Sequence, residues 1–153
     1  MSNLPRKRLR RPRQSVVVPF EFIDLDEGGN HVMLHGAING HPCRMILDTG
    51  ASRTVADLTF IQSTFPETAL ESNEQLSAGL GTNTMQSHFF VANEIRLGDK
   101  TIPGQLLAVL DLSHVNQTYQ MLGIPEVQII LGSDILKAHK AIIDYGGMQL
   151  ILG

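Results

Sequence analysis

The sequence predicts an all-β fold with one or two short helices. Three glycine-containing turns each separate two apolar stretches of strand length, and two-residue turns of this kind close β-hairpins. These turns are Asn39-Gly40, Gly98-Asp99 and Gly146-Gly147. Apolar residues spaced three or four apart, the pattern of an amphipathic helix, occur only in short segments. Repeated hairpins with so little helix indicate that paired strands build the core.

Each expected strand is rich in β-branched or aromatic residues, or alternates in its hydrophobicity. Cys43, Met45 and Leu47, for example, occupy every second position and are expected to share one face. Such alternation predicts strands with one buried side. In chain order the expected strands are 16–23, 31–38, 41–47, 89–97, 100–110, 141–145 and 148–152.

Helical signals are few. Segment 53–63 places apolar residues three apart, with Ser52 or Thr54 as the expected N-cap. A second short helix is expected to begin with Ser133 as its cap. Segment 111–125 has no clear period, so we expect a long irregular connection there.

The chain has the size of one domain. Its 153 residues, 42% of them hydrophobic, can enclose a core without a disulfide, and Cys43 is the only cysteine. The apolar runs are far shorter than a membrane-spanning helix. No apolar segment of signal-peptide length follows the basic N-terminus, because Pro19 and Glu21 interrupt it. We therefore expect a cytoplasmic protein.

Residues 1–14 are expected to form a basic, flexible arm ahead of the folded domain at 15–153. Six of the twelve Lys and Arg residues lie between positions 6 and 13. The other six stand against fifteen Asp and Glu, which gives the rest of the chain a net charge of roughly −9. Such an arm can contact nucleic acid, an acidic partner or an anionic membrane surface. It can equally be a solvated terminus without a partner.

The residues with the clearest chemical signal are Asp48-Thr49-Gly50. An apolar strand ends just before Asp48, and the turn that follows can fix its carboxylate at the floor of a cleft. Gly50 has no Cβ and lets another backbone approach closely, while Thr49 can hold that backbone through its hydroxyl. Ala51 leaves room for a substrate.

Three separated motifs resemble those of the retropepsin family, the aspartic proteases related to retroviral proteases, and occur in the family's order. The first is Leu47-Asp48-Thr49-Gly50-Ala51-Ser52. The second, similar to the glycine-rich tip of the flap that closes over bound peptide, is Ala78-Gly79-Leu80-Gly81-Thr82. The third, an apolar pair and a glycine before a short helix, is Ile130-Leu131-Gly132. The resemblance extends over most of residues 15–152.

The resemblance implies a retropepsin-like acid-protease half-barrel that hydrolyses peptide bonds as a homodimer. Each subunit then contributes one catalytic carboxylate, Asp48, because the chain has a single Asp-Thr-Gly. A water activated between the two carboxylates attacks the peptide bond, and neither a metal nor an organic cofactor takes part. The implied partners are a second copy of the chain and a peptide or protein in extended conformation. The residues that would support the catalytic pair are Thr49, Gly50, Ala51, Ser52, Ile130, Leu131 and Gly132.

Two positions depart from the viral pattern. Retroviral members usually carry Asp where this chain has Ser52 and Arg where it has Ser133, and those residues form an ion pair near the dimer contact. Replacing both together leaves no buried charge unpaired. The catalytic motif therefore survives, and the departure concerns how the dimer is built.

Other interpretations remain open. A retropepsin-like domain can bind a peptide or dimerise without catalysis, and the segment around Gly79 and Gly81 can be an ordinary surface loop. In a third interpretation the domain serves mainly to dimerise a nucleic-acid-binding arm. The rest of the chain offers little stacking surface for such a role, with two Tyr and no Trp.

The six histidines do not predict a metal site. His31 and His35 are four residues apart on an expected strand, which separates their Cα atoms by roughly 13 Å. One ion cannot bridge that distance. The other four histidines are scattered along the sequence, so we expect no metal.

Overall fold

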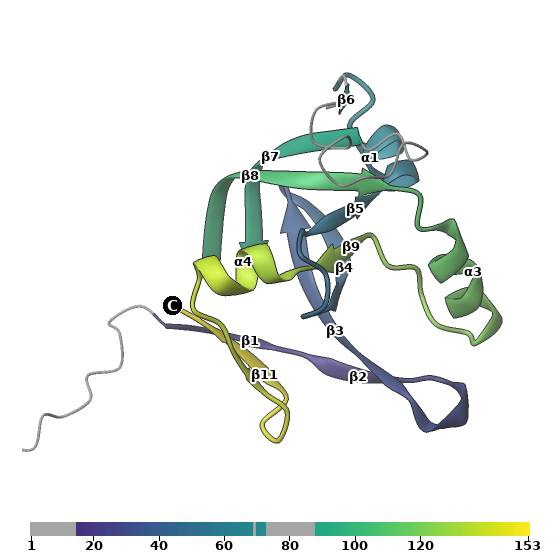
Figure 1. Cartoon of the computed structure of the whole chain (residues 1–153), viewed down its shortest axis with the longest axis vertical. Helices are drawn as coiled ribbons and strands as arrows, with labels where there is room; N and C mark the ends of the chain where they lie inside the picture. Colours follow the sequence, from purple (N-terminus) through teal and green to yellow (C-terminus); the bar gives the residue numbers. More distant parts are fainter. Residues whose placement is uncertain (1–14, 69, 73–87) are drawn as a thin grey trace, which may run out of the picture.

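A computed structural model describes residues 15–68, 70–72 and 88–153 of the chain. Its centre is a closed barrel of six strands, in which β3 and β7 complete the ring β3-β4-β9-β5-β8-β7 (Figure 1). The all-β prediction is confirmed. The barrel strands are β3 (Asn30–Ile38), β4 (His41–Leu47), β5 (Val55–Asp57), β7 (His88–Leu97), β8 (Lys100–Leu110) and β9 (Ile129–Leu131).

Two strands extend the barrel sheet at its ends, and three others form a separate sheet. Strand β2 (Glu21–Asp24) pairs with β3, and β6 (Glu71–Ser72) pairs with β7. The second sheet has the order β1-β11-β10, so β11 is central. We call it the terminal sheet; its strands are β1 (Val16–Pro19), β10 (Ile142–Asp144) and β11 (Gln149–Leu152).

All three predicted hairpins are present. Strands β3 and β4 pair antiparallel across Asn39-Gly40, where both turn residues have positive φ, 48° and 81°. Strands β7 and β8 pair across Gly98-Asp99, and β10 and β11 pair across the turn that contains Gly146-Gly147. One predicted strand, 16–23, is divided in two, because β1 joins the terminal sheet while β2 joins the barrel.

The helix predicted at 53–63 is wrong in its first half. Residues 55–57 are strand β5, which pairs with β8 and β9 inside the barrel. Helix α1 (Leu58–Thr64) begins only afterwards, and its N-cap is Asp57, whose side chain accepts a bond from the Phe60 amide. Tertiary pairing of a short buried strand has overridden the local helical period.

The irregular connection predicted at 111–125 is also wrong, since helix α3 (Ser113–Met121) occupies most of it. Tyr119 is buried and Val115 packs against the second core. With Leu112 and Leu122 they are three or four residues apart, a helical pattern that the prediction overlooked. The Asn116 side chain bonds both the amide and the carbonyl of Val127, which fixes α3 beside the barrel. The apolar side of α3 and the Asn116 amide together hold the helix.

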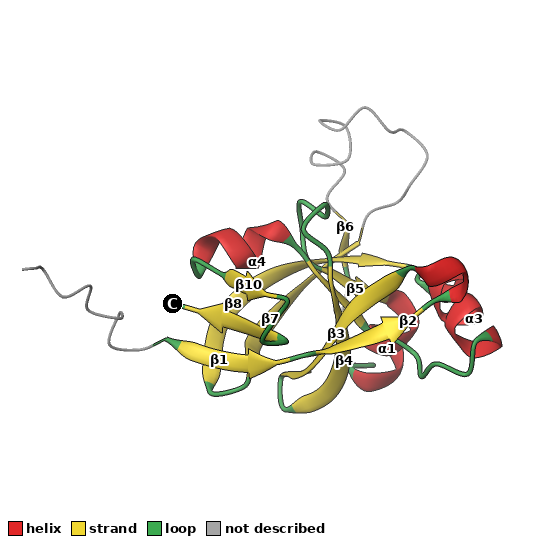
Figure 2. Ribbon diagram, turned by 90° about the horizontal axis from the view of Figure 1, so that it is seen from below, coloured by secondary structure: helices red, strands yellow, loops and turns green. Residues whose placement is uncertain are grey.

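The second predicted helix is confirmed as α4 (Ser133–Ala138). Ser133 is its first residue, however, and the N-cap is Gly132. Helix α4 lies toward the terminal sheet, whereas α1 and α3 lie toward the other end of the barrel (Figures 1 and 2).

The main core fills the barrel and continues under the terminal sheet. It includes Met45, Leu131 and Leu107 from the barrel together with Val18 and Leu152 from the terminal strands. A second, smaller core lies outside the barrel beneath α3. Its buried members are Ile23, Met33, Ile46, Tyr119 and Val127.

The predicted arm, 1–14, and the predicted flap tip, Ala78 to Thr82, lie outside the described residues. Both stay predictions. No helix in the described ranges is long and apolar enough to cross a membrane.

Candidate active site

Asp48 directly follows β4 and lies where β4 and β9 run parallel side by side. Its amide donates a hydrogen bond of 3.0 Å to the Leu131 carbonyl, which continues the pairing of the two strands by one residue. The Asp48 side chain is exposed in the single subunit. Asp48, at the end of barrel strand β4, therefore presents its carboxylate on the outside of the barrel.

The turn after Asp48 orients this carboxylate. The Gly50 amide donates to Asp48 Oδ1 at 2.9 Å, and the Ala51 amide donates to the Asp48 carbonyl at 3.2 Å. The expected close approach of another backbone at Gly50 is not found within the subunit, because a Cβ there would meet only Asp48 Oδ1, at 3.2 Å. Gly50 instead keeps the turn compact around the carboxylate.

The close backbone approach occurs at Gly132. A Cβ on Gly132 would lie 2.7 Å from the carbonyl carbon of Arg53 and 2.8 Å from the carbonyl oxygen of Ala51. The next amide, that of Ser133, donates to the same Ala51 oxygen at 2.7 Å. The loop at 48–54 is thus packed directly on the start of α4, and only glycine fits at the contact.

A buried threonine and an acidic residue complete the support of this loop. Thr54 is fully buried, and its hydroxyl donates to Asp134 Oδ1 at 2.7 Å and accepts from the Gly132 amide at 3.0 Å. The Thr54 amide lies 3.0 Å from both oxygens of Asp134. Sequence reasoning missed this network, because 80 residues separate its two members and neither has a distinctive spacing.

An apolar row runs across four strands beside Asp48. Ile46 is paired with Ile130, Ile130 with Val55, and Val55 with Ala108. Paired residues share a face, and Ile46 shares the face of Asp48 because side chains alternate along a strand. Ile130, Val55 and Ala108 are only half-buried. Ile46 itself is buried in the second core. We call Ile130, Val55 and Ala108 the apolar floor; they give Asp48 a hydrophobic surface on which an extended peptide can lie.

The predicted support residues are brought together by the fold. Thr49, Gly50 and Ser52 are exposed around Asp48, while Leu131 and Gly132 lie behind it and are buried. Ile130 belongs to the apolar floor and not to the backing of the turn. Val55, Thr54 and Asp134 are the additions that the sequence did not indicate.

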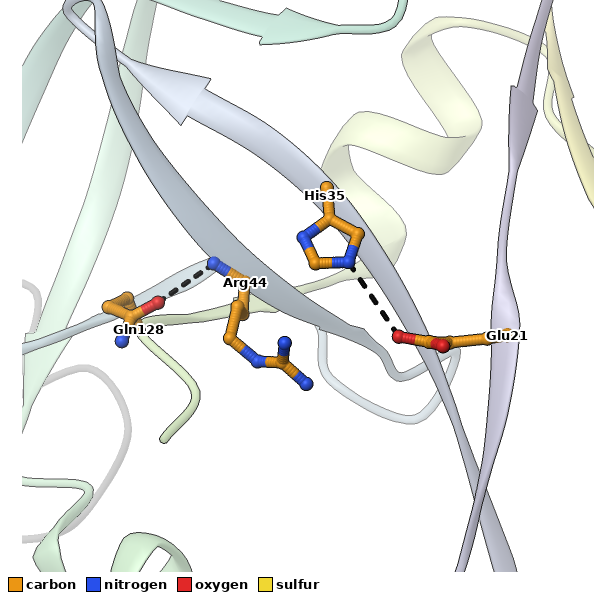
Figure 3. A network of polar contacts seen from close by, with 4 residues as sticks. All are labelled: Glu21, His35, Arg44 and Gln128. Carbon is orange, nitrogen blue, oxygen red and sulfur yellow. Dashed lines mark hydrogen bonds and ion pairs between the residues drawn. The ribbon is translucent and has the colours of Figure 1, made fainter. Parts of the chain in front are cut away.

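The histidines have other contacts. His31 Nδ1 is hydrogen-bonded to the Tyr119 hydroxyl. His35 Nε2 lies 3.6 Å from Glu21 Oε1, on the outer face of the barrel beside Arg44 (Figure 3). Within the described part of the chain no group of three His, Cys, Asp or Glu side chains is placed to hold a metal ion. Burial raises the pKa of the Cys43 thiol to about 12, so this cysteine is a poor nucleophile at neutral pH.

The sequence model of a known family, described as aspartyl protease, matches residues 34–135. This match covers more than half of the chain and includes both the Asp48 loop and the start of α4. The chain belongs to the aspartyl protease family. No curated protein matches it.

Solved structures also resemble the chain in fold. One is a retropepsin-like aspartic protease from Rickettsia conorii, with 19% identity, a TM-score of 0.57, and coverage of 91% of this chain and 90% of that one. Another is the retroviral protease-like domain of Ddi1 from Leishmania major, with 15% identity, a TM-score of 0.56, and coverage of 80% and 87%. The predicted retropepsin-like fold is confirmed.

Proposed function

We propose that the protein is an aspartic endopeptidase that acts as a homodimer, with one Asp48 from each subunit in the active site. The observation that carries the proposal is the placement of Asp48: it is exposed, oriented by the Gly50 amide, and next to the apolar floor. A carboxylate presented in this way from a rigid loop is suited to catalysis.

A single carboxylate cannot perform the reaction alone. Two carboxylates about 3 Å apart cannot both ionise, so they share a proton, as is general for aspartic proteases. The ionised member takes a proton from a bound water, and the protonated member polarises the carbonyl of the peptide bond. The chain contains a single Asp-Thr-Gly, at residues 48–50, so the second carboxylate has to come from another copy.

The terminal sheet supports such a dimer. One of its faces packs on the core, but the other carries a row of apolar residues in which Val17 and Ile142 flank Ile151. Val17 is 52% exposed and Ile142 is 58% exposed. Strands that are apolar on both faces are typical of sheets covered on both sides. A second copy packed on this face would bury the row.

The test compares wild-type protein with an Asp48→Asn variant on a diverse peptide mixture, at several pH values from acidic to neutral. Asparagine keeps the size of the side chain but cannot share a proton between two carboxyl groups. We expect cleavage by the wild type alone. Cleavage by both proteins would show that Asp48 is not a catalytic residue. No cleavage by either, together with binding of extended peptides, would favour the non-catalytic binding module.

A further inference from the structure

We propose that Arg53 selects acidic residues in the bound peptide, an inference that rests on the proposed protease function. Arg53 lies five positions after Asp48 in the same loop, and it is exposed. It is the only Lys or Arg between Asp48 and the end of β5. The catalytic loop therefore carries one positive charge close to the reacting carboxylate.

The backbone on both sides of Arg53 is anchored. Before it, the Ala51 carbonyl accepts from the Ser133 amide at 2.7 Å, and after it, Thr54 is bonded to Asp134. The Arg53 carbonyl itself packs on Gly132, where an added Cβ would lie 2.8 Å from its oxygen. The side chain thus starts from a fixed position, which is what a selective contact requires.

Arg53 is a close neighbour of the apolar floor along the chain. Thr54, bonded to Asp134 of α4, and Ala56, a member of the main core, are both fully buried. Val55 lies between them and belongs to the apolar floor. Arg53 lies in a bend two residues before Val55, so their Cα atoms are at most about 7 Å apart. Its exposed charge is therefore next to the floor and in the same loop as Asp48.

Within the described ranges the Arg53 guanidinium has no ion-pair partner, since the two ion pairs there join His35 to Glu21 and Arg96 to Glu94. A guanidinium has five N–H donors in a planar fork that fits a carboxylate. Its matching ligand is therefore an Asp or Glu side chain of the peptide.

Two-fold symmetry predicts where the acidic residues should lie in the peptide. In a homodimer the second Arg53 lies on the opposite side of the scissile bond, at the same distance from the paired carboxylates. The preference for acidic residues should therefore appear at two positions, spaced equally on either side of the cleaved bond.

The first experiment identifies cleavage sites of the wild type, Arg53→Gln and Arg53→Glu in one diverse peptide mixture by mass spectrometry. Arg96→Glu is the matched control, since it makes the same charge change at an exposed residue of β7. Ion pairs near the surface change affinity by roughly 1.5- to 5-fold, so we expect kcat/KM for an acidic peptide to fall about 3- to 5-fold in Arg53→Gln. Arg53→Glu should prefer Lys and Arg at the same positions, and the control should keep the wild-type preference.

Two results would overturn the inference: no enrichment of acidic residues in wild-type sites, or the same enrichment in Arg53→Glu. Added salt should also weaken the wild-type preference.

A second experiment separates this inference from the protease function. An extended peptide with Asp at the two positions, and a matched peptide with Lys, are titrated into the Asp48→Asn protein and into Asp48→Asn with Arg53→Gln. Tighter binding of the Asp peptide that disappears with Arg53 supports the inference even if no peptide is ever cleaved. Equal binding of the two peptides by Asp48→Asn refutes it.

Discussion

The carboxylate of Asp134, in the first turn of α4, accepts hydrogen bonds from both the amide and the hydroxyl of Thr54. Thr54 ends the loop that carries Asp48, and Asp134 follows Gly132, on which this loop packs. The two residues therefore join the Asp48 loop to the helix behind it. Since Thr54 is fully buried and Asp134 half-buried, and both are hydrogen-bonded, the network can hold the loop in one geometry.

Replacing Thr54 by Val should destabilise the protein. Valine has nearly the same shape but no hydroxyl, so the Gly132 amide loses its acceptor and Asp134 loses a donor. A buried polar group left without a partner costs about 1–3 kcal/mol, and we expect the free energy of unfolding to fall by this amount. Urea denaturation measures it. Thr101→Val, at an exposed position of β8, is the control; an equal loss in both variants would argue against the network.

Gly132→Ala should lower the stability of the protein at least as much as Thr54→Val does. The added methyl group would lie 2.7 Å from the carbonyl carbon of Arg53, and either the catalytic loop or α4 has to move. Overpacking of this kind costs about 1–3 kcal/mol. Gly29→Ala is the control, because nothing lies within 4 Å of an added Cβ there. A melting temperature of Gly132→Ala equal to that of the control would contradict the close packing.

Ile142→Lys should weaken the dimer. A charge in the apolar row of the terminal sheet would be buried against the second copy, and the side chain would lose about 1.5–3 kcal/mol of burial. We expect the dimer dissociation constant, measured by analytical ultracentrifugation, to rise at least about tenfold. Met121→Lys replaces an apolar residue of α3 that is 87% exposed and should leave the dimer unchanged. An equal rise in the dissociation constant in both variants would show that the dimer interface does not lie on the terminal sheet.

Stability should fall in mildly acidic solution, partly through His139. Burial lowers the pKa of His139 below its usual 6.5, and the nearby Lys100 adds to the effect. The unfolded chain then takes up a proton as the pH falls below about 6.5 while the folded protein does not, which favours unfolding. His139→Gln should therefore show a smaller drop in melting temperature between pH 7.5 and 5.5. The same drop in both proteins would assign the pH dependence to other groups.

The hairpins and the Asp48 turn were predictable because their signals are local. Asn39-Gly40 closes a hairpin through its own backbone preferences, and Asp48-Thr49-Gly50 is contiguous in sequence. The strand character of residues 55–57 was not predictable in this way. It comes from pairing with β8 and β9, and both partners lie more than fifty residues away.

The Thr54–Asp134 network was missed for a related reason, since its two members are 80 residues apart. Helix α3, in contrast, was predictable. Leu112, Val115, Tyr119 and Leu122 are three or four residues apart, and Val115 and Tyr119 pack in the second core. The apolar floor was only partly predicted. Ile130 was identified through its motif, whereas Val55 joins it through a cross-strand pair that only the register of β5 and β9 reveals.

Subunit mixing distinguishes one active site formed by two Asp48 carboxylates, one from each subunit, from two independent sites. Wild type and Asp48→Asn are mixed in equal amounts under conditions that allow subunit exchange, and peptide cleavage is measured at constant total protein. Random pairing leaves about one quarter of the dimers with two Asp48 residues, so activity should fall to about one quarter of the wild-type value. Activity of about one half would mean that each subunit works alone, and would contradict the shared site.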